Sequence, residues 1–171
     1  MITPYRLRAL ARATKYIGTK ENPPGSNHGT LIDEWCRRTN GIRGGYPWCA
    51  AFMYCMFADI GCDLKGKGLS GPALVENWVT LARKRLWTRT RPYKGDVCCF
   101  DWDSNGWRDH IGIVERVLAV RWRGGKFVGW VRSIEGNTAA TASGDQSNGG
   151  MVERKWRWVN GSQVYIRVPG P

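Results

Sequence analysis

The first half of the chain carries apolar residues at helical spacing. Leu7, Leu10 and Ile17 lie on one stripe of a predicted helix that ends at Gly18. The run WCAAFMYCMFADI at residues 48–60 is almost continuously apolar. Because this run is too long for a typical strand and too short to cross a membrane, it predicts a buried helix. Two further helices are predicted over Thr30–Arg38 and Pro72–Arg85.

From Arg91 onward the pattern changes to strands. Segments rich in β-branched and aromatic residues alternate with turns of Gly, Asp and Asn, and Gly124-Gly125 predicts a hairpin turn. Helices followed by an antiparallel sheet indicate an α+β fold, and 171 residues suffice for one domain over 1–171. The predicted strands are Asp96–Trp102, His110–Val120, Lys126–Glu135, Met151–Val159 and Gln163–Val168.

Composition adds a strong positive charge to this pattern. The chain has 26 Lys and Arg against 14 Asp and Glu, a net charge of +12. This excess predicts an anionic partner, which could be nucleic acid, a membrane surface or an acidic polymer. The segment Leu81–Lys94 holds six basic residues and no acid, interleaved with Trp87 and Tyr93. Such a segment suits an anionic polymer or single-stranded nucleic acid, although most charge runs are solvated faces.

The N-terminus does not have the pattern of a signal peptide. Residues 1–20 carry four Arg and Lys before Lys20 and no continuous apolar segment. We therefore expect the protein to be made in a cytoplasm and, if it acts outside, to be released by a route other than a signal peptide. No segment approaches the ~18 apolar residues of a membrane span. The six Cys form no C-x-x-C pairs, which disfavours a zinc site, and they are expected to be reduced.

Two residues are candidates for nucleophilic catalysis. Cys49 begins the predicted buried helix, where unpaired N–H groups and the helix dipole stabilise a thiolate. His110 opens a strand that would hold its imidazole rigidly, and Gly112 beside it leaves room for a substrate. A thiolate nucleophile needs such a base. The alternatives are a Cys used for packing and a hydrogen-bonded structural His.

Two polar residues follow on a later strand. Glu135 and Asn137 are two positions apart, so alternation predicts that they share one face of the sheet. A carboxylate or amide beside a histidine base fixes its tautomer and orientation. The alternative is a solvated strand end before a Gly turn.

Four motifs surround these residues: YPWCAAF around Cys49, Gly95-Asp96-Val97, DHIGIVE from Asp109 and IEGNT from Ile134. Together they resemble the CHAP domain. This family comprises the cysteine, histidine-dependent amidohydrolases and peptidases, which are relatives of the NlpC-type and papain-like enzymes. The resemblance extends from about Thr14 to Arg167, and the loops Glu21–Asn27 and Ser147–Gly150 also resemble phage members from actinobacterial hosts.

The resemblance implies a papain-like fold, with N-terminal helices packed on a twisted antiparallel sheet. It also implies a monomeric phage lysin that hydrolyses peptidoglycan, at the muramoyl–alanine amide or within the peptides, and requires no cofactor. Cys49 would be the nucleophile and His110 the general base and then acid. Glu135 would orient His110, and Asn137 would share that role or polarise the scissile carbonyl. Expected substrate contacts are Trp48, Gly112 and Trp107.

The loop DWDSNGWRD, which ends immediately before His110, resembles the front of a calcium-binding loop. Oxygen donors occupy its first, third, fifth and ninth positions, and Gly occupies the sixth. The twelfth position is Gly112 where a calcium loop has Glu, so a loop held by Asx turns is the alternative. The candidate calcium ligands are Asp101, Asp103, Asn105 and Asp109.

A basic nucleic-acid-binding module without catalysis is the alternative function. It explains the net charge but leaves the order of Cys49, His110 and Glu135 to coincidence. Salt-dependent binding of oligonucleotides, without loss of turbidity of cell walls, would favour it. If the chain is a hydrolase, we expect the charge to hold it at peptidoglycan and anionic wall polymers, with no specific nucleic acid bound.

Overall fold

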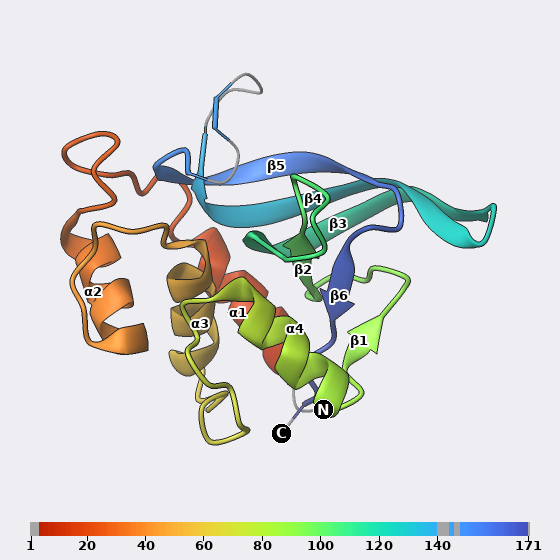
Figure 1. Ribbon diagram of the computed structural model, residues 1–171, viewed down its shortest axis with the longest axis horizontal. Helices are drawn as coiled ribbons and strands as arrows, with labels where there is room; N and C mark the ends of the chain where they lie inside the picture. Colours follow the sequence, from red (N-terminus) through yellow and green to blue (C-terminus); the bar gives the residue numbers. More distant parts are fainter. Residues whose placement is uncertain (1–3, 140–143, 146–147, 171) are drawn as a thin grey trace.

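The computed structural model describes residues 4–139, 144–145 and 148–170, so Ser147 of one phage-like loop lies outside the described residues (Figure 1). Within these ranges four helices precede six strands, which confirms the predicted α+β fold. The helices are α1 (Tyr5–Thr14), α2 (Thr30–Asn40), α3 (Cys49–Ala58) and α4 (Val75–Lys84). The strands are β1 (Thr88–Arg89), β2 (Val97–Phe100), β3 (His110–Arg123), β4 (Lys126–Thr138), β5 (Met151–Val159) and β6 (Val164–Ile166).

All described strands join one antiparallel sheet in the order β1-β6-β2-β3-β4-β5. The hairpin of β3 and β4 turns at Gly124-Gly125, as predicted, and both glycines have positive φ. Such a turn matches the right-handed twist of the two strands. The tip of this hairpin extends beyond the helices as an arm (Figure 1).

The predicted elements differ from the observed ones mainly at their ends. α1 stops at Thr14, because the chain leaves the helix through turns before Gly18. α4 begins at Val75 instead of Pro72. β1 was not predicted, because two residues form no recognisable period; the strand exists through its pairing with β6.

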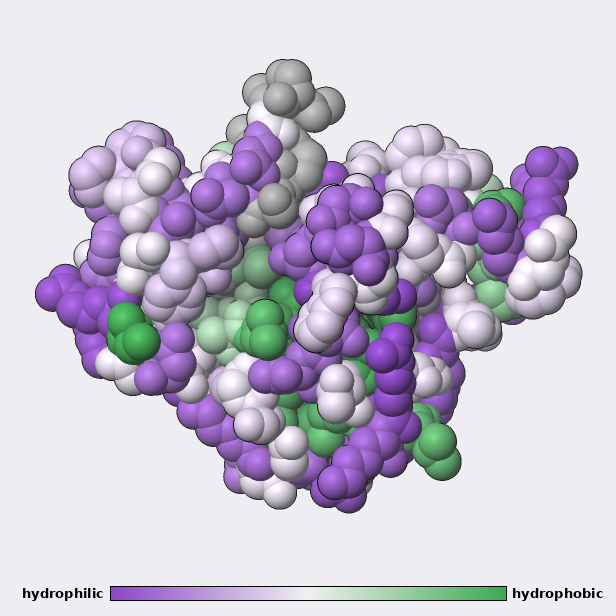
Figure 2. Space-filling model, viewed as in Figure 1, coloured by the Kyte–Doolittle hydropathy of each residue, from purple (hydrophilic) through white to green (hydrophobic). Residues whose placement is uncertain are grey.

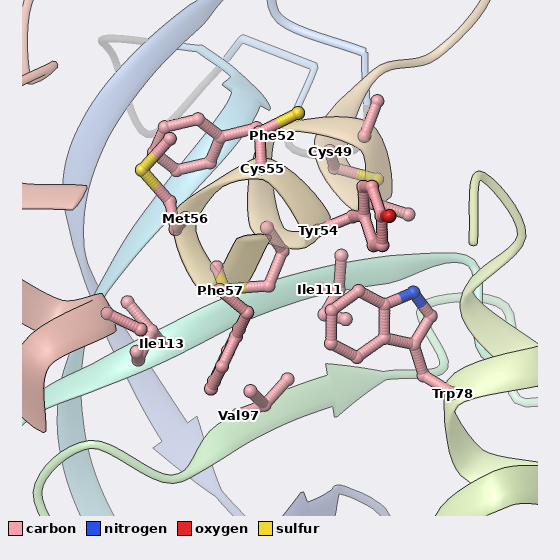
Figure 3. Close-up of a cluster of buried hydrophobic side chains, with 14 of the residues drawn as sticks. Cys49, Phe52, Tyr54, Cys55, Met56, Phe57, Trp78, Val97, Ile111 and Ile113 are labelled. Carbon is pink, nitrogen blue, oxygen red and sulfur yellow. The ribbon is translucent and has the colours of Figure 1, made fainter. Parts of the chain in front are cut away.

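α3 lies at the centre of the fold and confirms the predicted buried helix. Each of its residues except Ala58 is buried. It packs against β3 and β4 and is flanked by α1 and α2. Figure 3 shows Phe57 of α3 reaching toward Ile113 of β3 and Val97 of β2, whereas Phe52 and Met56 lie on the other side of the helix. A helix that is apolar on every side is stabilised by its surroundings and has no face for solvent.

β4 lies close to the first turn of α3 at Gly136. A Cβ atom at this position would lie 2.9 Å from the Cβ and ring of Phe52, so a larger residue does not fit without a shift. This contact brings the end of β4, including Glu135, beside the start of α3, where Cys49 lies.

Hydrophilic residues cover most of the face seen in Figure 2, as expected from the net charge of +12. No helix in the described ranges is both long enough and apolar enough to cross a membrane. All six Cys lie within those ranges, where they are buried and form no disulfide.

Candidate active site

α3, β3 and β4 bring Cys49, His110 and Glu135 together. Cys49 is the first residue of α3 and is 3% exposed, whereas His110 and Glu135 are fully buried. In the β3–β4 ladder Gly112 pairs directly with Glu135. Because His110 lies two residues before Gly112, its side chain is on the same face of the sheet as Glu135. The three candidates that are far apart in the sequence are therefore neighbours in the fold.

The two ring nitrogens of His110 have different surroundings. Nε2 lies 2.9 Å from Oε2 of Glu135. Nδ1 makes no full hydrogen bond to any described residue, but the Cys49 thiol is near enough to interact with the ring. The imidazole therefore has a carboxylate on one side and is open to the thiol on the other, which is the arrangement a cysteine nucleophile requires.

The buried groups shift each other's pKa in opposite directions. Burial opposes the charged form of His110, but the Cys49 thiol and the Glu135 carboxylate outweigh burial and raise the pKa of His110 to about 9. Burial also opposes the charge of Glu135, but hydrogen bonds from Arg157 and His110 lower the pKa of Glu135 to about 2. At neutral pH the site therefore holds an imidazolium beside a carboxylate.

Arg157 of β5 was missed by the sequence analysis. Its guanidinium donates hydrogen bonds to both carboxylate oxygens of Glu135. Alternation along β5 could have indicated its direction, because Trp156 and Trp158 are exposed and Arg157 between them points inward. The partner could not be predicted, since it depends on the register between strands.

Asn137 does not join the catalytic candidates, so the prediction from alternation is wrong here. The β4–β5 ladder is irregular between Glu135 and Thr138, and Asn137 has a φ of 57°. Its Nδ2 donates to Oδ1 of Asn148 at 3.0 Å, and its Oδ1 accepts from the backbone N–H of Gly150 at 3.2 Å. Asn137 therefore holds together the two ends of the loop that follows β4.

The three expected substrate contacts have different outcomes. Trp48 is fully buried and donates its indole N–H to Oε1 of Glu21 at 3.0 Å, so it anchors the chain before α3 instead of facing a substrate. At Gly112 an added Cβ would lie 2.6 Å from Cγ of Glu135, so the carboxylate side chain occupies the room expected for substrate. Trp107 is 63% exposed and stays a candidate contact.

Three acidic side chains of the loop before β3 lie close together. Ligand atoms of Asp101, Asp103 and Asp109 lie within 4.8 Å of one another, and hard oxygen donors suit calcium. Asp101 also accepts from the backbone N–H groups of Asn105 and Gly106, and Asn105 donates its amide to Asp103. These are the Asx-type bonds of the alternative interpretation. Calcium binding stays a prediction.

The largest of the described cavities, about 890 Å³, lies between α2 and the loop before it. Its lining includes His28, whose Nδ1 is 2.8 Å from Asp33, and Arg43, which lies 3.1 Å from the same carboxylate. The lining includes neither Cys49 nor His110, so this cavity is separate from the candidate active site.

Comparison with known families agrees with this geometry. A family model described as the CHAP domain matches residues 41–144, well over half of the chain. The matched range includes Cys49, His110 and Glu135, whereas Arg157 lies beyond it. No curated protein and no solved structure matches the chain.

Proposed function

Since the chain belongs to the CHAP domain family, whose general activity is amide hydrolysis in peptidoglycan, we propose that it is a lysin with Cys49 as nucleophile. One observation carries this proposal. A thiol at a helix start lies beside a buried imidazole whose far nitrogen is 2.9 Å from a buried carboxylate. Release from a phage-infected cytoplasm, or carriage by the virion, is part of the proposal.

The first half of the reaction forms a thioester. The Cys49 thiolate attacks the carbonyl carbon of the scissile amide, and negative charge develops on the carbonyl oxygen. No side chain among the described residues caps the start of α3, so its first N–H groups are placed to stabilise that charge. The His110 imidazolium gives its proton to the amide nitrogen as the C–N bond breaks. An amine leaves, and the acyl group stays on sulfur.

The second half consumes one water molecule. Neutral His110 takes a proton from water while the water oxygen attacks the thioester carbon. The C–S bond then breaks, which releases a carboxylic acid and restores the thiolate–imidazolium pair. Glu135 remains a carboxylate throughout, where it orients the ring and balances its positive charge.

The same mechanism can cleave either of two amide bonds in peptidoglycan. One is the muramoyl–alanine amide, and the other is a peptide bond of the stem or cross-bridge. Mass spectrometry of digested peptidoglycan distinguishes them. A new lactyl carboxylate on muramic acid indicates an amidase, whereas a new peptide amine with the muramoyl linkage intact indicates an endopeptidase. A digest with neither product contradicts the proposed function.

The proposal includes attachment of the domain to anionic wall polymers. The basic segment predicted to bind such polymers ends beside β3, where a cavity of about 740 Å³ is lined by Arg91, Tyr93, Lys94, Arg116 and Arg132 among others. With Glu115 as the acid in its lining, the cavity has an excess of positive charge that fits phosphate or carboxylate groups.

Exposed tryptophans continue this surface across the sheet. Trp130 and Trp158 pair directly across β4 and β5, and Arg132 lies over the ring of Trp156 at 5.6 Å. Trp130, Trp156 and Trp158 are each about half exposed, and exposed apolar patches with a polar rim mark binding surfaces. Aromatic rings beside arginines fit a polymer that contains both sugars and anionic groups.

Co-sedimentation with purified cell walls at increasing salt tests this attachment. We expect binding to weaken as salt screens the charges, while hydrolysis of small uncharged fragments changes little. Binding that is unchanged from low to high salt would contradict an electrostatic attachment. Salt-dependent binding of oligonucleotides without any wall hydrolysis would instead support the nucleic-acid-binding alternative.

A further inference from the structure

Arg157 has no part in the mechanism above, although it lies directly behind its carboxylate. Nε of Arg157 donates to Oε1 of Glu135 at 2.9 Å, and Nη2 donates to Oε2. Two parallel bonds from a planar guanidinium fix the direction of a carboxylate as well as its place. The Oε2 atom that Arg157 binds is also the atom 2.9 Å from Nε2 of His110.

The guanidinium group is itself held in place from three elements. Its carbon lies 4.8 Å from the ring centre of Trp102 and 5.7 Å from that of Phe100, and the two rings stack with centres 4.7 Å apart. Nη2 also lies 3.3 Å from Oγ1 of Thr138. Arg157 belongs to β5, Phe100 to β2 and Thr138 to β4. The pairing of these strands in the sheet therefore fixes the position of the guanidinium group.

The burial of Glu135 explains why such a partner is needed. A fully buried carboxylate is costly unless it is paired and hydrogen-bonded. Burial raises the pKa of Glu135, and the hydrogen bond from Arg157 is the largest of the effects that lower it. Ser133 donates a further bond to Oε1. Among the described residues, the titratable groups besides Arg157 that interact with this carboxylate include His110, Cys98 and Lys155.

We propose that Arg157 is a positioning residue for hydrolysis, which keeps the Glu135 carboxylate ionised and aimed at Nε2 of His110. Arg157 acts through Glu135 and does not touch the substrate. The inference rests on the proposed function, because hydrolysis by Cys49 and His110 is the reaction that it supports. It assigns a role to a residue that lies outside the range matched by the family.

Steady-state hydrolysis of a small peptidoglycan fragment by Arg157→Met and Arg157→Lys tests this role. Met keeps an extended apolar side chain without hydrogen-bond donors. Lys keeps the positive charge but cannot donate two parallel hydrogen bonds to one carboxylate. We expect kcat to fall about 10²-fold in Arg157→Met, the lower end of what general acid–base catalysis contributes, and by less in Arg157→Lys. KM should stay nearly unchanged. Millimolar guanidinium should restore part of kcat in Arg157→Ala, which a loss of packing alone would not allow.

Arg154→Met is the matched control, because Arg154 lies on the same strand and pairs with Glu115 on the opposite face at 3.0 Å. We expect it to keep the kcat of the unaltered protein. Folding of each variant is checked by circular dichroism and thermal unfolding. If Arg157→Met does not fold, the kcat of Arg157→Lys and the guanidinium rescue of Arg157→Ala test the role of Arg157 instead.

Two results separate the failure of this inference from the failure of the proposed function. An unaltered protein that hydrolyses no peptidoglycan overturns both. An active unaltered protein with an unchanged kcat in folded Arg157→Met or Arg157→Lys, or without guanidinium rescue of Arg157→Ala, overturns the role of Arg157 alone.

Discussion

The two faces of the β4–β5 pair carry arginines in opposite environments. On the inner face, Arg157 is 9% exposed and is bound to the fully buried Glu135. On the outer face, Arg132 and Arg154 share the Glu115 carboxylate, and their side chains are 32% and 39% exposed. Exposed ion pairs contribute about 0–1 kcal/mol, whereas removing one partner of a buried pair costs about 3–5 kcal/mol. The same residue type therefore forms a buried pair with a carboxylate on one face and partly exposed ion pairs on the other.

The largest expected effect is at the nucleophile, which α3 places beside the inner-face residues His110 and Glu135. Cys49→Ala should fold as the unaltered protein does and lose all clearing of cell walls, because the thioester of the proposed mechanism forms on the Cys49 sulfur. Turbidity of purified walls measures this. Cys62→Ala is the control, since Cys62 is also buried and takes no part in the site, so that variant should stay active. Full clearing by Cys49→Ala would refute the mechanism.

The second-largest effect is expected at Glu135 of the inner face, and Glu115 of the outer face is the matched comparison. Glu135→Gln removes the buried negative charge that accepts two hydrogen bonds from Arg157 and faces His110, so we expect a loss of about 3–5 kcal/mol in the free energy of unfolding and a large loss of kcat. Glu115→Gln should cost at most about 1 kcal/mol and leave kcat unchanged. Urea denaturation and hydrolysis assays measure both. Equal stability losses in the two variants would remove the contrast between the faces.

The pH dependence of hydrolysis tests the charge state of the inner face. Because the pKa of His110 is raised to about 9, the ring stays protonated at neutral pH and loses its proton as the pH rises through about 9. The imidazolium that protonates the leaving amine disappears with that proton, so kcat/KM should fall on an alkaline limb near pH 9. A limb near 6.5, the ordinary pKa of His, would mean that Glu135 and Cys49 do not stabilise the imidazolium.

The smallest effect is expected on the outer face. Trp158 is 51% exposed, so Trp158→Ala should change stability little and leave hydrolysis of small fragments as it is. Binding to whole cell walls at low salt should weaken several-fold, as measured by co-sedimentation. Trp122→Ala removes a tryptophan of similar exposure from the hairpin arm and should bind normally. Equal weakening in both variants would argue against a localised binding surface.

Local patterns in the sequence were sufficient for much of the site. The apolar run predicted α3 with Cys49 at its start, and strand alternation placed His110 at the beginning of β3. Glu135 followed from its position on the next strand. These features depend on residues that are close together in sequence, where helical and strand periods apply.

The remaining features depend on contacts between distant segments. Asn137 leaves the expected face because the β4–β5 ladder is irregular there, and periodicity alone does not reveal that irregularity. The burial of Trp48 depends on Glu21, which is 27 positions away. Arg157 finds its carboxylate only through the register of two strands. Long-range register and buried polar pairs were therefore the parts that the sequence did not reveal.

The absence of a polar face on α3 has a consequence for how this protein gains and loses activity. A helix of ten residues is marginal by itself in water, and this one has only tertiary contacts to stabilise it. The thiol is therefore positioned only after helices and sheet have assembled around it. Unfolding of the core and loss of hydrolysis should coincide on heating, so residual activity directly reports the fraction of intact molecules.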